Sequence, residues 1–335
     1  MDKIYGFFKN KKVLVTGAGG FIGSHLAEKL VEIGASVDAM VHYNALNSWG
    51  NLELCDPEKR KALNVVLGDV SDPFFMNRAV KGKDVVFHLA ALIGIPYSYV
   101  APQQYVATNI QGTVNVLEAV RNNGIAKMVH TSTSEAYGTA IYTPIDEKHP
   151  LQGQSPYSAS KIAADMMAES YFRSFETPVA VCRPFNTYGP RQSSRAVIPT
   201  MIIQLLRKNK KLKLGLLDTY RDFNFVADTV DGFLAVGALE KTAGQVINLA
   251  SGRTVTIQET LEKLMTITGV QVEVEQESAR IRPDKSEVMK LQGDARKALE
   301  LIGWTSRVSL EEGLKVDVEW YMRHLDRYKG DMYHI

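Results

Sequence analysis

The chain has 335 residues, of which 45% are hydrophobic and 23% charged, and its formal net charge is +2. This length allows one large domain or two smaller lobes, and the near-neutral charge argues against nucleic-acid or membrane-surface partners. No uncharged apolar stretch reaches the roughly 20 residues that span a bilayer. The first apolar run is too short for a signal sequence, and only two cysteines are present, Cys55 and Cys182. The histidines lack metal-ligand spacing, so we expect no metal site and a cytoplasmic location.

The first half alternates short valine-rich runs with helical patterns, as expected for repeated βαβ units. Consecutive apolar positions in these runs are typical of parallel strands that are covered on both faces. The strands are predicted at Lys12–Thr16, Ala35–Val41, Asn64–Leu67, Asp84–Leu89, Ala126–Thr131 and Val179–Arg183, and the intervening helices at Ile22–Ile33, Tyr105–Asn122 and Pro156–Phe175. The fold class is therefore α/β, a doubly wound parallel sheet of the Rossmann type.

The rhythm changes after Pro184, where strands become isolated and polar. Helices are expected near Ile198–Lys208, Ala227–Leu239, Ile257–Thr268 and Ser309–Arg327, the last opening on a capping box at Ser309 and Glu312. We predict a dinucleotide-binding domain over residues 1–184 and a smaller C-terminal α/β substrate lobe over 185–335. Part of the later chain is expected to return to the first domain.

A glycine-rich turn follows the first predicted strand. Gly17, Gly20 and Gly23 have the spacing that gives a tight turn, a bare backbone for a pyrophosphate and close helix packing. Phe21 and Ile22 open the helix whose N-terminus supplies free N–H groups. Glycine turns also occur for structural reasons alone, but this one stands at the first βα junction of a βαβ series, as a dinucleotide site requires.

The second predicted strand ends without the acid that usually holds an NAD ribose. His42 follows it, with Tyr43 and Asn44, and a 2′-phosphate would not be repelled there. We therefore expect NADP rather than NAD, although His42 can equally be a plain surface residue. Asp69, followed by Val70, can accept a hydrogen bond from adenine or simply cap the next helix.

Two further groups carry chemistry. Tyr157 and Lys161 stand four apart on a helix that Ser155 caps, so the ammonium is expected to lower the pKa of the phenol and make it a general base. Such a pair also arises by chance among 14 tyrosines. The fifth strand ends in Thr133-Ser134-Glu135, where a doubly wound sheet places its ligands. Glu135 can alternatively be a solvent-facing charge.

Taken together, four motifs resemble the extended short-chain dehydrogenase/reductase family that acts on nucleotide sugars. They are TGAGGFIGSHL at 16–26, HLAAL at 88–92, the Tyr157/Lys161 pair and RPFNTYGPR at 183–191. The Thr-Ser-Glu triplet resembles the 4,6-dehydratase and sugar-acid decarboxylase branches, whereas epimerases usually carry no carboxylate there. Residues 91–98 and 150–157 look most like dehydratases of nucleotide-linked N-acetylglucosamine, which open routes to legionaminic acid.

The resemblance implies a role for each catalytic residue. Tyr157 takes the C4 hydroxyl proton while Thr133 hydrogen-bonds it, and hydride passes to a tightly bound, recycled NADP or NAD. Glu135 then removes the C5 proton as water leaves C6. Lys161 also anchors the nicotinamide ribose. Ser134 stands where glucose-type dehydratases place an aspartate acid, so Glu135 or a relayed water would protonate the leaving hydroxyl.

The resemblance also implies binding positions. Further dinucleotide contacts are expected at Leu89, Ala90, Ala91 and Pro184. The nucleotide-sugar substrate, with uracil or guanine as the expected base, would meet Ile93, Asn186, Arg191, Val197, Arg221 and Arg282. Arg221 and Arg282 match the phosphate-binding positions, since a guanidinium can bond two phosphate oxygens at once. Relatives pair the helices that match 105–122 and 156–175 across a two-fold axis, which implies a homodimer.

Three alternatives stay open. A UDP-glucuronate decarboxylase shares the triplet but needs a cation near C6, and Leu92–Ser98 offers none. A C4 epimerase of the same family is a second alternative. A non-catalytic dinucleotide-binding redox sensor is a third, against which the joint presence of Tyr157, Lys161 and Glu135 argues.

Overall fold

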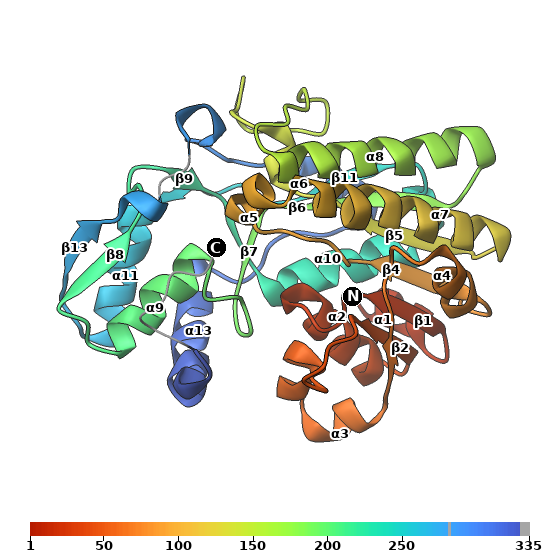
Figure 1. Cartoon of the computed structure of the whole chain (residues 1–335), viewed down its shortest axis with the longest axis horizontal. Helices are drawn as coiled ribbons and strands as arrows, with labels where there is room; N and C mark the ends of the chain where they lie inside the picture. The colour runs from red at the N-terminus through yellow and green to blue at the C-terminus, as the bar shows by residue number, and fades with distance from the viewer. Residues whose placement is uncertain (281–282, 329–335) are drawn as a thin grey trace.

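The computed structural model describes residues 1–280 and 283–328, and a seven-stranded parallel sheet forms its centre (Figure 1). The strands lie in the order β11-β6-β5-β4-β1-β2-β3. The chain adds β2 and β3 on one side of β1 and then crosses to the other side, where β4 and the later strands follow, so the topological switch point lies between β1 and β4. The strands are β1 Lys12–Thr16, β2 Ser36–Val41, β3 Leu63–Leu67, β4 Val85–His88, β5 Lys127–Thr131, β6 Val179–Pro184 and β11 Val246–Leu249. The predicted doubly wound Rossmann fold is confirmed.

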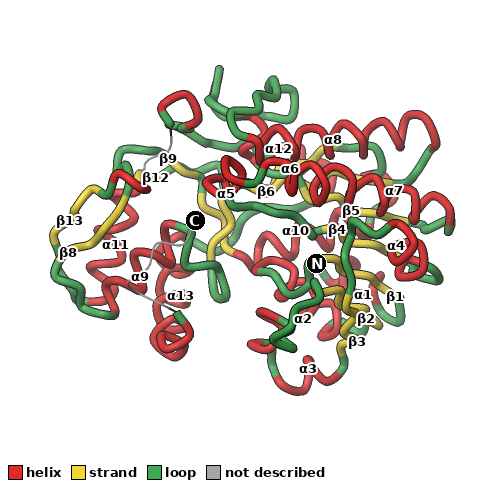
Figure 2. Tube along the Cα trace, in the orientation of Figure 1, coloured by secondary structure: helices red, strands yellow, loops and turns green. Residues whose placement is uncertain are grey.

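Helices cover both faces of this sheet (Figures 1 and 2). One face carries α1 Asp2–Phe8, α2 Phe21–Glu32 and α10 Val226–Ala238, and the other carries α4 Pro73–Val80, α7 Gly112–Asn122 and α8 Pro156–Phe175. Alternate side chains of β1 serve the two layers, as the pleat of a strand requires. Val13 and Val15 join the core under α2, whereas Leu14 joins the core under α7.

The remaining chain forms a lobe beside the carboxyl edge of the sheet, at the left in Figure 1. Its strands pair two by two: β7 Asn186–Tyr188 with β10 Phe223–Phe225, β9 Tyr220–Arg221 with β12 Val255–Thr256, and β8 Lys211–Leu214 with β13 Glu273–Gln276. Its helices are α9 Val197–Leu206, α11 Ile257–Thr268 and α13 Leu310–His324. The capping box of Ser309 and Glu312 is present at the start of α13, as predicted.

Short elements complete the chain. The helices are α3 Pro57–Lys61, α5 Ile95–Val100, α6 Pro102–Tyr105 and α12 Arg296–Ile302. One-turn elements are η1 Gly50–Leu54, η3 Ser134–Tyr137, η4 Glu240–Thr242, η5 Ser278–Arg280, η6 Asp284–Ser286 and η7 Leu325–Arg327, and η2 Val106–Gln111 is a π-helical turn. Within the described residues, every helix is too short or too polar to cross a bilayer.

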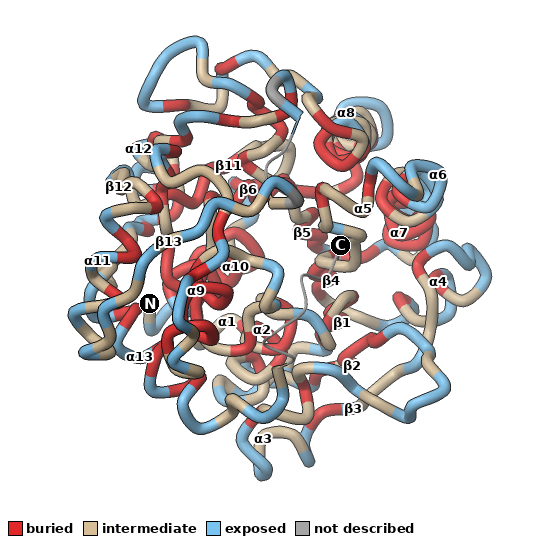
Figure 3. Tube along the Cα trace, turned by 60° about the vertical axis from the view of Figure 1, so that its left-hand side comes forward, coloured by how far each residue is buried: buried red, intermediate tan, exposed pale blue. Residues whose placement is uncertain are grey.

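One feature of the fold differs from the sequence-based expectation. The helix predicted over Tyr105–Asn122 is divided into α6, the π turn η2 and α7. Strand β11 comes from the late chain and pairs in parallel with β6, while α10 packs under the first sheet. Figure 3 shows β5, β6 and α10 as largely buried segments, so the two halves of the chain share one core.

Candidate functional site

The carboxyl edge of the parallel sheet gathers the residues that the sequence predicts for a dinucleotide. β1 leads into the glycine turn, β2 into His42, and β3 through Gly68 into Asp69 and buried Val70. β4 is followed by Leu89, Ala90 and Ala91, and Pro184 ends β6. Ligands of doubly wound sheets bind at this edge, beside the switch point between β1 and β4.

The glycine turn is built so tightly that side chains are excluded. Gly17 has a φ of +72°, and a Cβ there would lie 2.7 Å from the backbone nitrogen of Ala90. A Cβ on Gly23 would overlap the carbonyl oxygen of Gly17. Gly20 is the N-cap residue of α2 and has no side chain that could accept a hydrogen bond. The N–H groups at the start of the helix, at Phe21 and Ile22, therefore receive no side-chain cap from it. This cradle fits a pyrophosphate.

The loops after β2 and β3 meet each other. His42 Nε2 lies 3.1 Å from Asp69 Oδ2, and both side chains are largely accessible to solvent. Hydrogen bonds from Ser71, together with His42, lower the pKa of Asp69 although burial opposes the shift. Tyr43 is 69% exposed, and Asn44 bonds the backbone of Ser48. No carboxylate follows β2 directly, as read from the sequence.

Tyr157, Thr133 and Glu135 meet at the end of β5. The Thr133 hydroxyl shares a hydrogen bond with the Tyr157 phenol, and Glu135 is near enough for its charge to act on that phenol. Thr133 caps the turn η3, where it accepts from the backbone N–H of Glu135 at 3.3 Å. Ser134 is 3% exposed in the same turn. The structure thus brings together the predicted base, its hydroxyl partner and a second carboxylate.

The expected effect of Lys161 on Tyr157 is not found. Burial raises the pKa of Tyr157 well above its ordinary value, with Thr133 lowering it and Glu135 raising it, and Lys161 is not among the causes. Its ammonium instead donates to the backbone carbonyl of Thr131 at 2.6 Å. Burial lowers the pKa of Lys161 to about 8, and Asp165 opposes the shift. Tyr157 therefore rests as a neutral phenol.

A buried network next to Lys161 was missed in the sequence. Asp165, one helical turn further along α8, accepts hydrogen bonds from Ser132 at 2.5 Å and Arg183 at 2.7 Å. His130 lies 3.1 Å from its other oxygen. Asp165 is fully buried, and although burial raises its pKa, Arg183 and His130 hold that pKa well below the usual range. The i, i+4 spacing from Lys161 was the only available signal.

The π turn η2 places Asn109 where it connects the loop after β4 to α8. Asn109 accepts from the backbone N–H of Leu92 at 2.8 Å and donates to the carbonyl of Leu92 at 2.9 Å. It also donates to the Ser160 hydroxyl at 2.9 Å, next to Lys161. π turns often occur at functional sites. Nothing in the sequence pattern distinguishes this turn from regular helix.

A cavity of about 440 Å³ opens between the sheet edge and the second lobe. Asn186, Val197 and Arg221, all predicted to bind substrate, line it. So do residues that sequence reasoning missed, among them Gln192, Arg195 and Arg280. Arg221 pairs with Glu287 at 3.1 Å and Arg280 with Glu277 at 2.5 Å. Three guanidiniums in one cavity suit a diphosphate.

Two acceptors in this cavity are unsatisfied by the described residues. Asn186 Oδ1 and Gln192 Oε1 are both buried without a hydrogen-bond partner there. Buried amide oxygens normally accept a hydrogen bond, and these two receive none from the described residues.

Two of the other predicted substrate residues, Ile93 and Arg191, do not line the cavity. The guanidinium of Arg191 lies on Glu28 of α2 at 2.5 Å instead. Ile93 is 60% exposed in the loop before α5. Arg282 lies outside the described residues.

A comparison with models of known protein families identifies the family of this chain. The family model described as GDP-mannose 4,6 dehydratase matches residues 14–316. The chain belongs to this family. The relatives that this chain resembles include nucleotide-sugar dehydratases and nucleotide-sugar epimerases. This chain is therefore an enzyme of the dehydratase/epimerase group.

Three relatives define the likeness. A dTDP-glucose 4,6-dehydratase of Streptomyces griseus is 33% identical, with 93% of this chain and 94% of the relative covered. The solved dTDP-glucose 4,6-dehydratase DesIV of Streptomyces venezuelae, in complex with NAD, has a TM-score of 0.85 at 29% identity, covering 95% and 99% of the two chains. The UDP-glucose 4-epimerase of Thermotoga maritima, solved with UDP-glucose, has a TM-score of 0.84 at 32% identity, covering 94% and 99%.

Proposed function

We propose that this enzyme is a 4,6-dehydratase of a nucleotide-linked N-acetylglucosamine, with UDP or GDP as the nucleotide. The observation that carries the proposal is the Glu135 carboxylate beside the hydrogen-bonded Thr133 and Tyr157. An epimerase changes only C4 and needs no second base. A dehydratase must also remove the C5 proton, which requires a carboxylate at this place.

The chemistry follows from the positions of the side chains. The dinucleotide, when bound, supplies the hydride acceptor for oxidation at C4. Tyr157 is neutral at rest, so it must first release its phenolic proton to solvent. As the phenolate, which the neighbouring Thr133 hydroxyl favours, it can receive the C4 hydroxyl proton. Glu135 takes the C5 proton once C4 is a ketone and returns a proton to the leaving C6 oxygen, so that water departs and a 5,6-ene forms. A net loss of one water then requires that the hydride removed from C4 is returned to C6 and a proton to C5, which would leave the dinucleotide oxidised. Buried Ser134 has no acidic proton to offer for that step.

The cavity supports a nucleotide sugar as substrate. Arg221 and Arg195 supply cations for the diphosphate, and Asn186 supplies an unsatisfied acceptor. We propose the same phosphate role for Arg282 on its sequence position. Ile93 is proposed to meet the sugar when substrate is bound.

We further propose that the cofactor is NADP, tightly bound and recycled in each turnover. The support is the absence of a carboxylate directly after β2, where His42 stands 76% exposed. The DesIV relative was solved with NAD. His42→Asp should therefore shift the ratio of NADP to NAD dissociation constants toward NAD, because the new carboxylate would repel a 2′-phosphate and hold a 2′-hydroxyl.

One observation favours a second candidate, a UDP-glucuronate decarboxylase. Arg195 lines the cavity, and its Nη1 lies near Gly94, in the loop that follows β4. The sequence stretch Leu92–Ser98 lacks a cation, but the fold brings this one to it from a distant segment. A carboxylate at C6 could pair with Arg195.

One experiment separates these activities. Purified enzyme is incubated with UDP- and GDP-N-acetylglucosamine, dTDP-glucose and UDP-glucuronate, and the products are weighed by mass spectrometry. Loss of one water from an N-acetylglucosamine nucleotide supports the proposal, and loss of carbon dioxide from UDP-glucuronate supports the second candidate. An unchanged mass with C4 inversion by NMR would indicate an epimerase, and no turnover at all would favour a dinucleotide sensor.

We also propose a homodimer in the cytoplasm, formed through the α7 and α8 side of the sheet. Exposed apolar side chains occur there, including Val106 at 48% and Met166 at 43%. Sedimentation at micromolar concentration should give twice the monomer mass. Met166→Glu should shift the protein toward monomer if this face is the interface.

A further inference from the structure

Arg191 lies where the dinucleotide half of the chain meets the substrate half. It directly precedes the segment 192–197, of which Gln192, Arg195, Ala196 and Val197 line the cavity. Its backbone adopts a φ of +71°, a left-handed conformation that residues other than glycine rarely take. Such a conformation persists only where the surroundings hold it.

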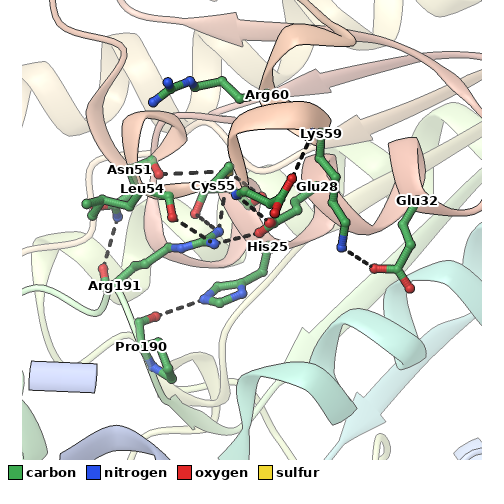
Figure 4. Close-up of polar contacts among 12 residues, drawn as sticks. His25, Glu28, Glu32, Asn51, Leu54, Cys55, Lys59, Arg60, Pro190 and Arg191 are labelled. Carbon is green, nitrogen blue, oxygen red and sulfur yellow. Dashed lines mark hydrogen bonds and ion pairs between the residues drawn. The ribbon is translucent and has the colours of Figure 1, made fainter. Parts of the chain in front are cut away.

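The surroundings that hold the side chain come from the dinucleotide half (Figure 4). The guanidinium donates to Glu28 Oε2 at 2.5 Å and to the carbonyl of Leu54 at 3.3 Å. Both side chains of the ion pair are buried, with 8% of Arg191 and 14% of Glu28 exposed. Glu28 is itself fixed, because its other oxygen accepts from the backbone N–H of Asp56 at 2.9 Å.

The backbone at this point is held from the same side. Asn51 Nδ2 donates to the carbonyl of Arg191 at 2.9 Å, and His25 Nε2 lies 2.8 Å from the carbonyl of Pro190. Burial, together with Arg191, lowers the pKa of His25 to about 4, so its imidazole is neutral near pH 7 and can donate that bond from Nε2. Figure 4 shows these contacts converging on Pro190 and Arg191 from α2 and η1.

The same group of residues reaches the glycine turn. The backbone N–H of Asn51 donates to the carbonyl of Gly19 at 2.9 Å. Gly50 is packed so closely that a Cβ there would lie 2.6 Å from that carbonyl oxygen. A continuous set of hydrogen bonds therefore runs from the turn that cradles the pyrophosphate, through Asn51, to the first residue before the cavity segment.

We propose that Arg191 is a positioning residue that couples the two binding sites. Its ion pair with Glu28 and its bond from Asn51 fix the segment 192–197 relative to the glycine turn. Arg191 thus acts on the nucleotide sugar through Gln192 and Arg195, and it does not touch the sugar itself. This inference rests on the proposed function only for the identity of the ligand.

The test compares Arg191→Met, Arg191→Lys and Glu28→Gln in the enzyme with its bound dinucleotide. The probe is UDP, with GDP and dTDP in parallel, and its dissociation constant is measured by calorimetry. Arg191→Met and Glu28→Gln should each weaken UDP binding and raise KM by about tenfold, with kcat changed far less, as typical coupling between sites predicts. Arg191→Lys keeps the charge and should recover part of the affinity. The double variant Arg191→Met/Glu28→Gln should bind UDP no more weakly than either single variant, because both changes remove the same ion pair.

The matched control is Asp38→Asn. It removes a similarly buried ion pair, Asp38 with Lys83 at 2.6 Å, within the sheet layer and away from 189–197. It should lower the melting temperature but leave UDP affinity unchanged. Hydrogen exchange of the ligand-free segment 189–197 gives a second readout, and it should accelerate in Arg191→Met and Glu28→Gln but not in Asp38→Asn.

Two results would overturn the inference. If Arg191→Met weakens UDP binding while Glu28→Gln changes neither affinity nor exchange, then Arg191 contacts the ligand directly. If both variants have a lower melting temperature but unchanged UDP affinity and unchanged hydrogen exchange of 189–197, the ion pair only stabilises the fold. Failure of the proposed function looks different: a decarboxylase or an epimerase would still bind UDP but give other products, and a protein that takes no nucleotide sugar would bind none of the three nucleoside diphosphates. In either case the exchange readout would still decide the role of Arg191.

Discussion

Glu135 and Tyr157 should control separable steps, because the C5 proton becomes acidic only after C4 is oxidised. Glu135→Gln keeps the shape of the side chain but removes the base, so C4 oxidation should continue while water loss falls by roughly 10²–10⁴-fold. Tyr157→Phe removes the group that receives the C4 proton and should abolish both steps. Product mass and the absorbance of reduced nicotinamide measure the two steps separately.

The outcome at Glu135 has a direct control in Ser134→Ala. Ser134 lies in the same turn η3 and is equally part of its packing, but it offers no carboxylate. Its replacement should change water loss far less than Glu135→Gln does. Normal dehydration by Glu135→Gln would remove the main support for a dehydratase.

The pH dependence at alkaline pH should report on Lys161. Burial lowers the pKa of its ammonium to about 8, with Asp165 opposing the shift. The ammonium exists below this pKa, so activity that needs the charge is lost as the pH rises through about 8. Asp165→Asn removes the opposing carboxylate, and the alkaline limb of kcat/KM should then move to lower pH.

Asp165→Asn also has a cost in stability, which must be measured beside activity. It leaves the Arg183 guanidinium buried without its carboxylate, a change that typically costs about 3–5 kcal/mol. A soluble variant whose alkaline limb stays in place would show that Asp165 does not act on Lys161. Ser132→Ala, which keeps the carboxylate and removes one bond to it, should leave that limb nearly unmoved.

At this scale the sequence predicted the residues that we propose as catalytic, but not all of those that hold them in place. Tyr157 and Lys161 were visible because their i, i+4 spacing follows a cap and a proline, and Glu135 because it lies in the segment that directly follows the fifth strand. The partners Asp165 and Arg183 stand 18 residues apart on α8 and β6 and meet only through packing. The predicted direction of the Tyr157 pKa was also wrong, because burial raises it while the Lys161 ammonium is bound to the carbonyl of Thr131.

The glycine turn between β1 and α2 is an element whose geometry leaves no room for a Cβ at Gly17 or Gly23. Gly23→Ala would place its methyl group on the carbonyl oxygen of Gly17, so the turn must shift and dinucleotide binding should be lost. Gly6→Ala is the matched control, because nothing lies within 4 Å of that position in α1. There alanine should stabilise the helix by up to about 1 kcal/mol. Equilibrium binding of NADP and NAD, with melting curves, measures both effects.

Elements with strong local signals were predicted well. The bounds of β1, α8 and α11 agree with the sequence reading, since caps, glycines and apolar periodicity mark both ends. The π turn inside the predicted helix 105–122 was missed because one extra residue per turn leaves no mark on an 18-residue pattern. Arg191 was assigned to the substrate on its motif, yet its left-handed backbone turns it toward α2.

At the scale of the whole molecule, the two halves of the chain complete one another. β11 extends the first sheet beside β6, and α10 covers the face under β5 and β6. Phe233, Leu234 and Val236 of α10 are fully buried in this shared core. The sequence led us to expect that part of the later chain returns to the first domain, but not which segment. The pairing of β11 with β6 has no local signal, because it joins residues more than sixty positions apart.

The shared core predicts that residues 1–184 will not fold alone. The fragment lacks α10 and β11, so it would expose Phe8, Phe87 and the edge of β6. Each large apolar side chain that loses its partner forfeits roughly 1.5–3 kcal/mol, and several such losses exceed the stability of a typical domain. We expect weak near-ultraviolet circular dichroism and no cooperative transition in urea. A fragment that continues to residue 251 regains both elements and should unfold cooperatively. Cooperative unfolding and dinucleotide binding by the 1–184 fragment would instead show that the first half is an independent domain.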